Sequence, residues 1–432
     1  MGYSISLLVV VLALAGAAVA QQPSAEMPGI GWNPPLPQPL PNSSAEKYSH
    51  VVGWPPNRTP TAPPGFRVSA FASGLDSPRW LYVLPNGDVL VAEARSHPKS
   101  DAPAPHREGM IRAGSVGVSA NRITLLRDSD RDGVAETRSI LLEHLNQPFG
   151  MALVGDTLFV ANTDGVMRFP YKDGQTRIDS PGDIILPLPS GGYNNHWTRN
   201  LLASRDGGKL YVTVGSASNA GEYGLDREIR RANILEINLD GSGERIFAAG
   251  LRNPNGMGWE PTTGALWTAV NERDGLGDDL VPDYITSVRE NGFYGWPYSY
   301  FGQNKDPVQG DKRPDLVARA IAPDYALGSH TASLGLVFYR GAGFPERYRG
   351  GAFVAQRGSW NRSRFSGYRV VFVPFRDGTP AGPPEDFLTG FMANAQTGEV
   401  HGRPVGLAVT ADGFLLVADD AGNTVWRVQS IP

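Results

Sequence analysis

The chain has 432 residues and contains no cysteine. This absence excludes disulfides, thiolate metal sites, a cysteine nucleophile and covalent haem attachment. Basic stretches are missing too, because 39 Lys and Arg are outnumbered by 43 Asp and Glu, which gives a formal net charge of −4. Without a basic run to neutralise phosphates, we expect no nucleic-acid partner.

Several catalytic motifs are also missing. The chain has no G-x-S-x-G elbow, no P-loop and no G-x-G-x-x-G after a predicted strand. These gaps argue against a serine hydrolase, an NTPase and a nicotinamide enzyme. The histidines show neither H-x-H nor H-E-x-x-H spacing, so a zinc site is not expected.

The longest apolar run is short. Residues 7–20 are apolar or small and end in Ala18-Val19-Ala20 before Gln21. This pattern predicts a secretory signal peptide over residues 1–20, and it is too short for a membrane span. We therefore expect export across the inner membrane to the periplasm, with no membrane span after cleavage; an uncleaved anchor is the alternative.

Proline dominates the next segment. Ten prolines between Pro34 and Pro64 prevent regular ladders, so residues 21–64 are predicted to form an irregular Pro-rich arm. The sequence leaves open whether the arm wraps the domain or stays mobile.

From residue 65 onward one strand–turn–strand pattern repeats. Each copy has an apolar strand, a turn rich in Gly, Asp or Asn, and a second apolar strand that ends in small residues. The six copies span residues 75–92, 145–161, 194–215, 251–269, 333–355 and 402–418. One copy cannot bury both of its faces, whereas a ring of copies can. The sequence predicts an all-β fold, a six-bladed β-propeller over residues 65–431.

Polar residues stand near the start of most copies. In a propeller they would converge on one mouth of the central channel. They include Gln147, Asn195 with His196, Arg252 with Asn253, and Arg403, while Arg199 follows His196 and Arg357 follows the second strand of the fifth copy. His196 could act as a general base. Three arginines at one mouth (Arg252, Arg357 and Arg403) predict a small polyanionic ligand, a polycarboxylate or a phosphate.

Two acidic segments suggest calcium. Asp128, Asp130, Asp132 and Glu136, with Gly133 at the bend, match the first half of a calcium loop, although Ser139 replaces the usual last glutamate. That ion would be structural, because the loop lies between the first two copies. The segment 271–279 is rich in Gly and Asp and could offer oxygen ligands to a second calcium ion.

The sequence resembles the soluble pyrroloquinoline quinone (PQQ)-dependent sugar dehydrogenases, most closely their sorbosone dehydrogenase-like branch. The resemblance covers about residues 65–431 and rests on four segments: Asn195-His196, residues 250–256, the loop 272–279 and residues 291–297. It implies a six-bladed propeller, PQQ with Ca²⁺ as cofactors, and a sugar or sugar-derived aldehyde as substrate. It also implies a separate electron acceptor.

The resemblance assigns roles at matching positions. His196 would be the general base, Arg252 would contact the reactive carbonyl of the quinone, and Asn253 would lie beside it on the cofactor. Gln147 would line the pocket. Arg357 stands where better-known members have a lysine on the cofactor carboxylates.

Further positions match or depart from the family pattern. Arg403 matches one carboxylate-binding arginine, while the second such position is Val405. The aspartate that commonly precedes the base is Asn195. Backbone carbonyls of Arg273, Asp274 and Gly275 would hold the calcium ion beside the quinone, although Asp274-Gly275 replaces the Gly-Pro of the family.

Two alternatives to a dehydrogenase remain. A six-bladed calcium-dependent lactonase would need side-chain Glu, Asn and Asp from several blades at the channel floor, whereas the copies here begin with Arg, Asn, Gln and His. A non-catalytic propeller that binds a peptide or glycan would tolerate loss of His196. The substrate and the oligomeric state are left open by the sequence.

Overall fold

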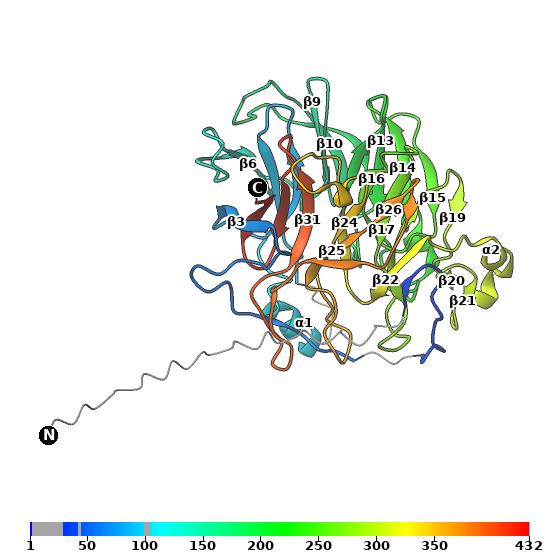
Figure 1. Cartoon of the computed structure of the whole chain (residues 1–432). Coiled ribbons are helices and arrows are strands. Elements are labelled where there is room, and N and C mark those ends of the chain that lie inside the picture. Colours follow the sequence, from blue (N-terminus) through cyan, green and yellow to red (C-terminus); the bar gives the residue numbers. More distant parts are fainter. Residues whose placement is uncertain (2–28, 42–44, 99–103, 432) are drawn as a thin grey trace.

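The computed structural model describes residues 1, 29–41, 45–98 and 104–431. Apart from Met1, the predicted signal peptide lies outside these residues. Strands dominate the described chain (Figure 1). The helices within it are short: α1 (Ala104–Arg112), α2 (Pro314–Arg319) and the 3₁₀ turns η1 (Leu225–Glu228), η2 (Gly310–Lys312) and η3 (Glu346–Tyr348). The prediction of an all-β fold is confirmed.

Six sheets of four or more strands occur among the described residues. The first contains β4 (Pro78–Val83), β5 (Val89–Glu93), β6 (Arg122–Arg127) and β7 (Thr137–Leu142). The second contains β8 (Met151–Val154), β9 (Thr157–Asn162), β10 (Gly165–Pro170) and β11 (Asp183–Pro187). The third contains β12 (Leu201–Ala203), β13 (Lys209–Val214), β14 (Asn233–Asn238), β15 (Arg245–Ala249) and the short β19 (Gly292–Phe293).

The remaining three follow the same plan. The fourth contains β16 (Pro254–Trp259), β17 (Leu266–Val270), β18 (Pro282–Ser287), β22 (Tyr325–Ser329) and the short β1 (Ile30–Gly31). The fifth contains β23 (Ser333–Phe338), β24 (Ala352–Gln356), β25 (Arg369–Val373) and β28 (Glu385–Leu388). The sixth contains β31 (Pro404–Val409), β32 (Leu415–Asp419), β33 (Thr424–Ser430) and β3 (Phe66–Ser73).

The sheets form a closed cycle. The first strand of each sheet contacts the first strand of the next, in the order β4, β8, β12, β16, β23, β31 and back to β4. The sixth sheet also joins the two ends of the domain, because β33 pairs with β3 (Figure 1). Each predicted strand–turn–strand unit is observed as the antiparallel pair that opens a sheet.

The apolar core is divided among the gaps between neighbouring sheets. Six clusters of buried apolar residues lie between successive sheets, and the cluster between the first and second sheets also includes Leu334 of β23 and Val405 of β31. For example, Trp80 of the first sheet packs against Phe149, which directly precedes the second sheet, with 4.8 Å between the ring centroids. A sheet in this arrangement is covered on both faces, which explains why the second strands are apolar without alternation and are fully buried.

Glycine lets the first strands approach one another. A Cβ atom on Gly256 in β16 would lie 2.5 Å from the backbone nitrogen of Leu336 in β23. A Cβ atom on Gly406 in β31 would lie 2.7 Å from the carbonyl oxygen of Arg79 in β4. The Pro-x-Gly pattern at the start of several copies therefore reflects close backbone contact between neighbouring sheets.

Described parts of the predicted arm lie against the loops of the domain. β2 (His50–Val51) pairs with β30 (Glu399–Val400), and β30 in turn pairs with β29 (Met392–Asn394). The indole nitrogen of Trp54 donates to Asp419 at 2.7 Å. Two further hairpins are β20 (Ser299–Tyr300) with β21 (Asn304–Lys305), and β26 (Phe375–Arg376) with β27 (Thr379–Pro380).

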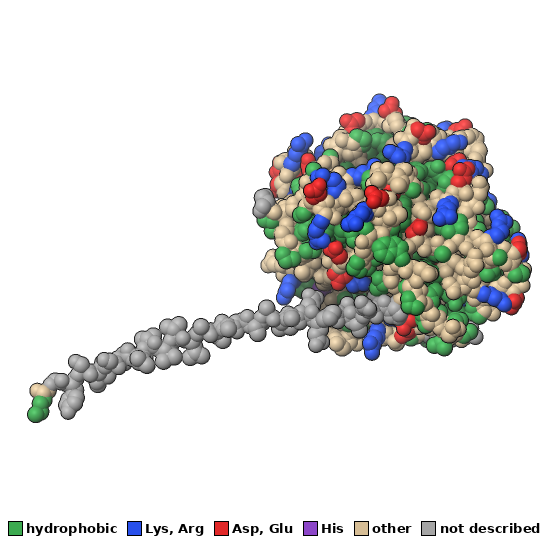
Figure 2. Space-filling model, turned by 45° about the vertical axis from the view of Figure 1, so that its right-hand side comes forward, with side chains coloured by type: hydrophobic (Ala, Val, Ile, Leu, Met, Phe, Trp, Pro, Cys, Tyr) green, Lys and Arg blue, Asp and Glu red, His purple; other side chains and the backbone are tan. Residues whose placement is uncertain are grey.

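The surface carries both signs of charge. On the face in Figure 2, Lys and Arg side chains are interspersed with Asp and Glu. Within residues 29–41, 45–98 and 104–431, no helix has the length and apolar character needed to cross a bilayer.

Candidate active site

A cavity of about 400 Å³ lies at one end of the ring. Its lining comes mainly from segments that lead into the first strands or follow the second strands, which meet at the same end of an antiparallel pair. His196 precedes β12 and Arg252 precedes β16, while Arg357 follows β24. Helix α1 adds His106 and Met110. The volume is in the range of small-molecule sites, about 300–1,000 Å³.

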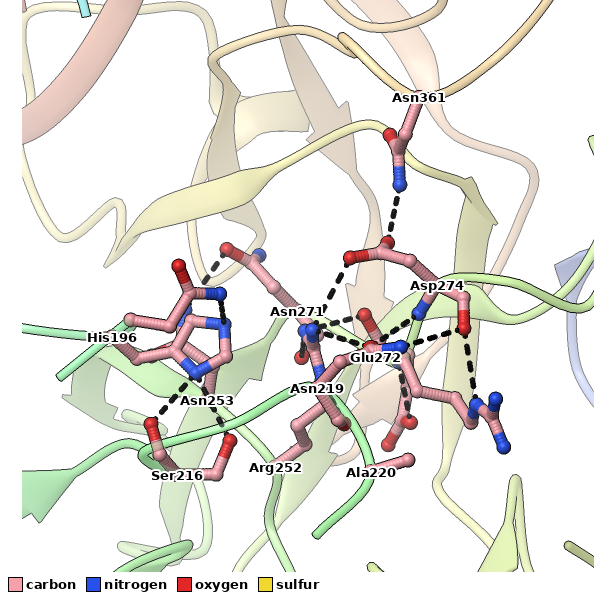
Figure 3. A network of polar contacts seen from close by, with 12 residues as sticks. His196, Ser216, Asn219, Ala220, Arg252, Asn253, Asn271, Glu272, Asp274 and Asn361 are labelled. Carbon is pink, nitrogen blue, oxygen red and sulfur yellow. Dashed lines mark hydrogen bonds and ion pairs between the residues drawn. The ribbon is translucent and has the colours of Figure 1, made fainter. Parts of the chain in front are cut away.

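His196 is held with a defined proton position (Figure 3). Its Nδ1 lies 2.9 Å from the carbonyl oxygen of Ser216 and 3.0 Å from the hydroxyl oxygen of the same residue. A carbonyl only accepts, and the Ser216 hydroxyl already donates to the carbonyl of Ser218 at 2.6 Å. Nδ1 therefore carries the proton, and the lone pair of the neutral ring lies on Nε2, 3.5 Å from the amide nitrogen of Asn195.

Gly215 permits this arrangement. A Cβ atom at this position would lie 2.5 Å from both the Cβ of His196 and the Oδ1 of Asn253. Only a residue without a side chain leaves room for His196 and Asn253 at the end of β13. The glycine that ends the third copy thus has a steric function in the cavity.

Arg252 is fixed by acceptors on two loops (Figure 3). Its Nε donates to the Asn219 carbonyl at 3.0 Å, and its Nη1 donates to the Glu272 carbonyl at 2.6 Å. Its Nη2 donates to the Asn219 side chain at 2.9 Å and lies 3.3 Å from Asp274. Trp296 donates to the same Asn219 carbonyl at 3.0 Å, so this indole helps to fix the arginine.

Asp274 is an anion in the cavity. Its carboxylate contacts Arg252, accepts a hydrogen bond from Asn361, and lies 3.3 Å from Nδ1 of His330. Burial would raise the pKa of Asp274, but Arg252, His330 and the charge of His196 outweigh it and lower the pKa to about 2. The pKa of His330 is raised, because Asp274 outweighs the opposing effect of burial.

Two neighbouring carboxyl groups behave differently. Burial raises the pKa of Glu272 to about 7, although Arg252 opposes the shift. Burial likewise raises the pKa of Asp283 to about 6. Both groups line the same cavity as Asp274, so the negative charge of this side of the cavity changes near neutral pH.

Another part of the cavity lining is positive. Three guanidinium groups share the single carboxylate of Asp420: Arg79, Arg357 at 2.6 Å and Arg403 at 2.9 Å. Burial lowers the pKa of Arg357 to about 9, with a smaller effect of Arg403, so Arg357 stays charged at neutral pH. Burial also lowers the pKa of Arg79, while the charge of Asp420 opposes this shift. The cluster formed by these four residues has two more positive than negative charges.

The structure brings together many of the predicted site residues. The cavity is lined by Asn195, His196, Arg252, Asn253, Asp274, Gly275 and Arg357. Arg403 is 2% exposed and stands behind the cavity through Asp420. Arg199 is buried and donates to the carbonyls of His196 and Pro189, at 2.7 and 2.9 Å.

Gln147 and Arg273 lie elsewhere. Gln147 lines a second, neighbouring cavity and donates to the carbonyl of Arg95 at 2.8 Å. The guanidinium of Arg273 pairs with Asp306. The carbonyl of Asp274 accepts from Asn219 at 2.9 Å and from Arg273 at 3.1 Å, so the protein already engages this predicted calcium ligand.

The other acidic loop gathers its carboxylates. One ligand atom from each of Asp128, Asp130, Asp132 and Glu136 lies within 4.8 Å of the others. Backbone N–H groups of the loop hold them, for example Gly133 donating to Asp128 at 2.9 Å. The loop precedes β7 and does not line the cavity.

Some residues of the site were not predicted. Arg79 and Asp420 complete the positive cluster. The sequence feature that could have identified them is a charged residue within or directly after an apolar strand. Ser216 and Asn219 follow β13, where nothing in the sequence distinguishes them from loop residues. His106 comes from α1, outside the repeated copies.

Two family models match the chain. The model described as glucose/sorbosone dehydrogenase matches residues 155–357, and a model described as TrAA12-like matches residues 301–430. An uncharacterised protein of Borreliella burgdorferi is 31% identical over 307 residues, which cover 68% of this chain and 79% of that protein. A pyrroloquinoline quinone-dependent sugar dehydrogenase of Hypocrea jecorina is 24% identical over 303 residues, 64% of each chain.

Solved structures match over most of the chain. The holo form of the pyranose dehydrogenase PQQ domain from Coprinopsis cinerea covers 89% of this chain and 100% of its own, with 20% identity and a TM-score of 0.68. A calcium structure of the Trichoderma reesei carbohydrate-active enzyme of family AA12 covers 86% and 97%, with 20% identity and a TM-score of 0.69. They show a propeller-type fold. By its fold and its sequence, the chain belongs to the glucose/sorbosone dehydrogenase family.

Proposed function

We propose that this protein oxidises a sugar or a sugar-derived aldehyde, with PQQ as the electron acceptor in the site. The observation that carries the proposal is the composition of one cavity. A histidine with its basic nitrogen defined stands in the same cavity as a buried arginine cluster with excess positive charge. A base and an anion-binding surface are what such a reaction needs from the protein.

The residues fit PQQ, which carries three carboxylates and a quinone. Arg79 and Arg357 would hold carboxylates, with Arg403 behind them. The Nε of Arg79 is buried without a hydrogen-bond partner in the described chain, as is the Oδ1 of Asn253. Such orphaned groups fit a bound molecule with polar edges. Arg252 and Asn253 would then face the quinone.

The base would act through Nε2 of His196. PQQ held by Arg79, Arg357 and Arg252 would supply a two-electron acceptor for the hydride of the substrate carbon. His196 would take the hydroxyl proton of the sugar, or of an aldehyde hydrate, on Nε2, while Nδ1 keeps its own proton and donates it to the Ser216 carbonyl. The resulting imidazolium would be positive, and the anionic Asp274 in the same cavity would favour it. Arg199 positions the base by holding its backbone carbonyl.

Calcium enters the proposal at two places. The carbonyls of residues 273–275 do not all fit an ion beside the quinone, because that of Asp274 already accepts two hydrogen bonds. The loop with Asp128, Asp130, Asp132 and Glu136 fits a structural Ca²⁺, a hard cation that prefers carboxylate oxygens.

The wider organisation is proposed as follows. The six sheets are the blades of a propeller over residues 65–431, residues 21–64 are an arm whose described parts (29–41 and 45–64) lie along its loops, and residues 1–20 direct export to the periplasm. Electrons leave to a separate acceptor. The arm contacts Trp360, a residue of the cavity lining. The backbone N–H of Lys47 donates to the Trp360 carbonyl at 2.8 Å, and the ring of Tyr48 stacks on the Trp360 indole.

Reconstitution tests the proposal. Purified protein with PQQ and Ca²⁺ should reduce an artificial dye in the presence of aldoses, sorbosone or simple alcohols. Without PQQ no reduction is expected. Lactone hydrolysis in the absence of PQQ would instead favour the calcium-dependent lactonase, and absence of both activities and of PQQ binding would favour the binding propeller.

The His196→Ala variant tests the base. Turnover should fall about 10²- to 10⁴-fold, the usual contribution of a general base, while PQQ affinity stays unchanged. His401→Ala is the matched control, because the Nδ1 of His401 also contacts a backbone carbonyl, Gly53 at 2.7 Å, but the residue lies outside the cavity. Near-normal turnover of His196→Ala would refute the assignment.

A further inference from the structure

Glu228 holds the loop that orients the base. It is the last residue of η1, and its side chain contacts the residues that follow β13. One oxygen of its carboxylate accepts the backbone N–H of Ala217 at 2.7 Å. The other oxygen accepts the backbone N–H of Ser218 at 3.0 Å and also the hydroxyl of Ser218. Glu228 does not line the cavity, and the proposed reaction does not yet use it.

The two N–H groups belong to peptide groups whose carbonyls hold the base. The Ala217 N–H and the Ser216 carbonyl form one peptide group, and this carbonyl accepts from Nδ1 of His196 at 2.9 Å (Figure 3). The Ser218 N–H and the Ala217 carbonyl form the next peptide group, and this carbonyl accepts the backbone N–H of Asn195 at 2.9 Å. A single carboxylate is therefore connected to both the ring and the backbone of the base segment.

A negative charge on the N–H end of a peptide group makes its carbonyl a stronger acceptor. Hydrogen bonds in a chain polarise one another, by about 10–30% per bond. The carboxylate of Glu228 shifts electron density toward the Ser216 carbonyl oxygen, which in turn binds the Nδ1 proton of His196 more strongly. The gain is largest when the ring becomes an imidazolium, because a charged donor forms the stronger hydrogen bond.

We propose that Glu228 is a positioning residue for the base. Through the peptide group of Ser216 and Ala217 its charge fixes the Nδ1 proton of His196 and strengthens that bond as Nε2 takes the substrate proton. No proton moves along this chain, since Nδ1 keeps its own proton and the Ala217 N–H stays intact. The proposal rests on the proposed function for the reaction, whereas the chain of hydrogen bonds can be measured without turnover.

NMR of the histidine rings tests the chain directly. In the full-length protein labelled with ¹⁵N-histidine, the His196→Gln variant identifies the Nδ1 proton of His196. The resonance of a shared proton moves downfield as its hydrogen bond strengthens. Glu228→Gln keeps the side-chain length but removes the charge, so this resonance should move upfield. An unchanged resonance in Glu228→Gln would overturn the proposal.

A second variant separates charge from shape. Glu228→Asp keeps the charge on a side chain that is shorter by one methylene group. If the charge matters, Glu228→Asp should retain more of the downfield shift than Glu228→Gln. The reverse order would show that Glu228 only fills space in the loop, and it would overturn the proposal.

Kinetics test the consequence for the reaction. In the dye assay with PQQ, Glu228→Gln should lower kcat about tenfold, the difference between a charged and a neutral acceptor, and leave KM and PQQ affinity unchanged. Unchanged kcat beside an active wild type would overturn the positioning role. If the wild type reduces no dye with any sugar, the proposed function fails, while the NMR result still decides whether the chain exists.

Glu260→Gln is the matched control for both measurements. Its carboxylate accepts the backbone N–H groups of Thr262 and Thr263 at 2.9 and 2.6 Å, and also the hydroxyl of Thr263. The pattern of acceptors is the same as at Glu228, but Glu260 lies in the turn between β16 and β17 and outside the cavity. Glu260→Gln should leave kcat and the His196 resonance unchanged.

Discussion

Replacing Asp420 by asparagine should destabilise the protein strongly. The Asp420 side chain is 1% exposed and is the shared partner of Arg79, Arg357 and Arg403. Asparagine keeps the shape and one acceptor oxygen but removes the negative charge. Three buried guanidinium groups would then face one another without a counter-ion. The adjacent Asp419 does not replace it, because its carboxylate accepts from Trp54, Trp426 and backbone N–H groups.

The size of the effect follows from burial. At an effective dielectric constant of about 20, each contact of unlike charges near 4 Å attracts by about 4 kcal/mol. Desolvation of the carboxylate and repulsion among the arginines cancel much of this sum. Breaking a buried pair by removal of one partner usually costs about 3–5 kcal/mol, and we expect a loss in that range. With an unfolding entropy of about 0.8 kcal/mol/K for roughly 400 residues, the Tm should fall by about 4–6 °C.

Calorimetry or thermal unfolding followed by circular dichroism measures this change. Asp386→Asn is the matched control, since Asp386 pairs with Arg369 at 2.6 Å but its side chain is 52% exposed. An exposed pair contributes about 0–1 kcal/mol, so the control should lose about 1 °C or less. Equal shifts for the two variants would refute the argument that burial makes the Asp420 cluster important.

The pH dependence supplies a second check. Burial would raise the pKa of Asp420, but Arg357, Arg403 and Arg79 outweigh it and hold the pKa well below its usual range. A carboxyl group with a lowered pKa in the folded state stabilises the fold above its unfolded pKa, near 3.9, and loses that effect as the pH falls. The difference between wild type and Asp420→Asn should therefore be constant from pH 8 to pH 5. A difference that vanishes by pH 5 would contradict the lowered pKa.

Two further predictions concern the site and the acidic loop. Gly215→Ala should lower turnover about 10²-fold by displacing His196 and Asn253, whereas Gly208→Ala, whose Cβ meets only its neighbour Asp206 at 3.5 Å, should be neutral in the same dye assay. Ca²⁺ at 100 times its Kd should stabilise the protein by about 2.7 kcal/mol, which corresponds to a Tm rise of about 3 °C. The Asp132→Asn variant should lose this rise, whereas Asp183→Asn, a change of an exposed carboxylate outside the loop, should keep it. An equal rise in Asp132→Asn would reject this calcium site.

The sequence predicted the repeated strand pairs because their signal is local. Two apolar strands and a Gly, Asp or Asn turn occupy a single short window, and each of the six windows is an antiparallel pair in the structure. The polar residues next to the repeated strands then predicted a site at one end of the propeller channel. The structure places three of them, His196, Arg252 and Arg357, in the lining of one cavity.

The side-chain contacts within the site were harder to predict from the sequence. Arg403 and Arg357 were expected to face the ligand directly, but Arg403 is turned to Asp420, Ser115 and the backbone. Asp420 follows an apolar strand like many solvated residues, and only the closed ring brings β32 and β4 close enough for three arginines to share it. A carboxylate that neutralises cations from several sheets has no local pattern.

Two departures from the family pattern become related once the chain is folded. Asn195 replaces the aspartate that commonly precedes the base, and its amide cannot stabilise an imidazolium by charge. Asp274 replaces a glycine of the loop that matches the calcium site, and its pKa of about 2 keeps it negative. The charge of His196 is one of the causes of that low pKa, so by reciprocity Asp274 favours the protonated base. In the proposed reaction Asp274, held by Arg252 and His330, would supply the negative charge that the amide of Asn195 does not provide.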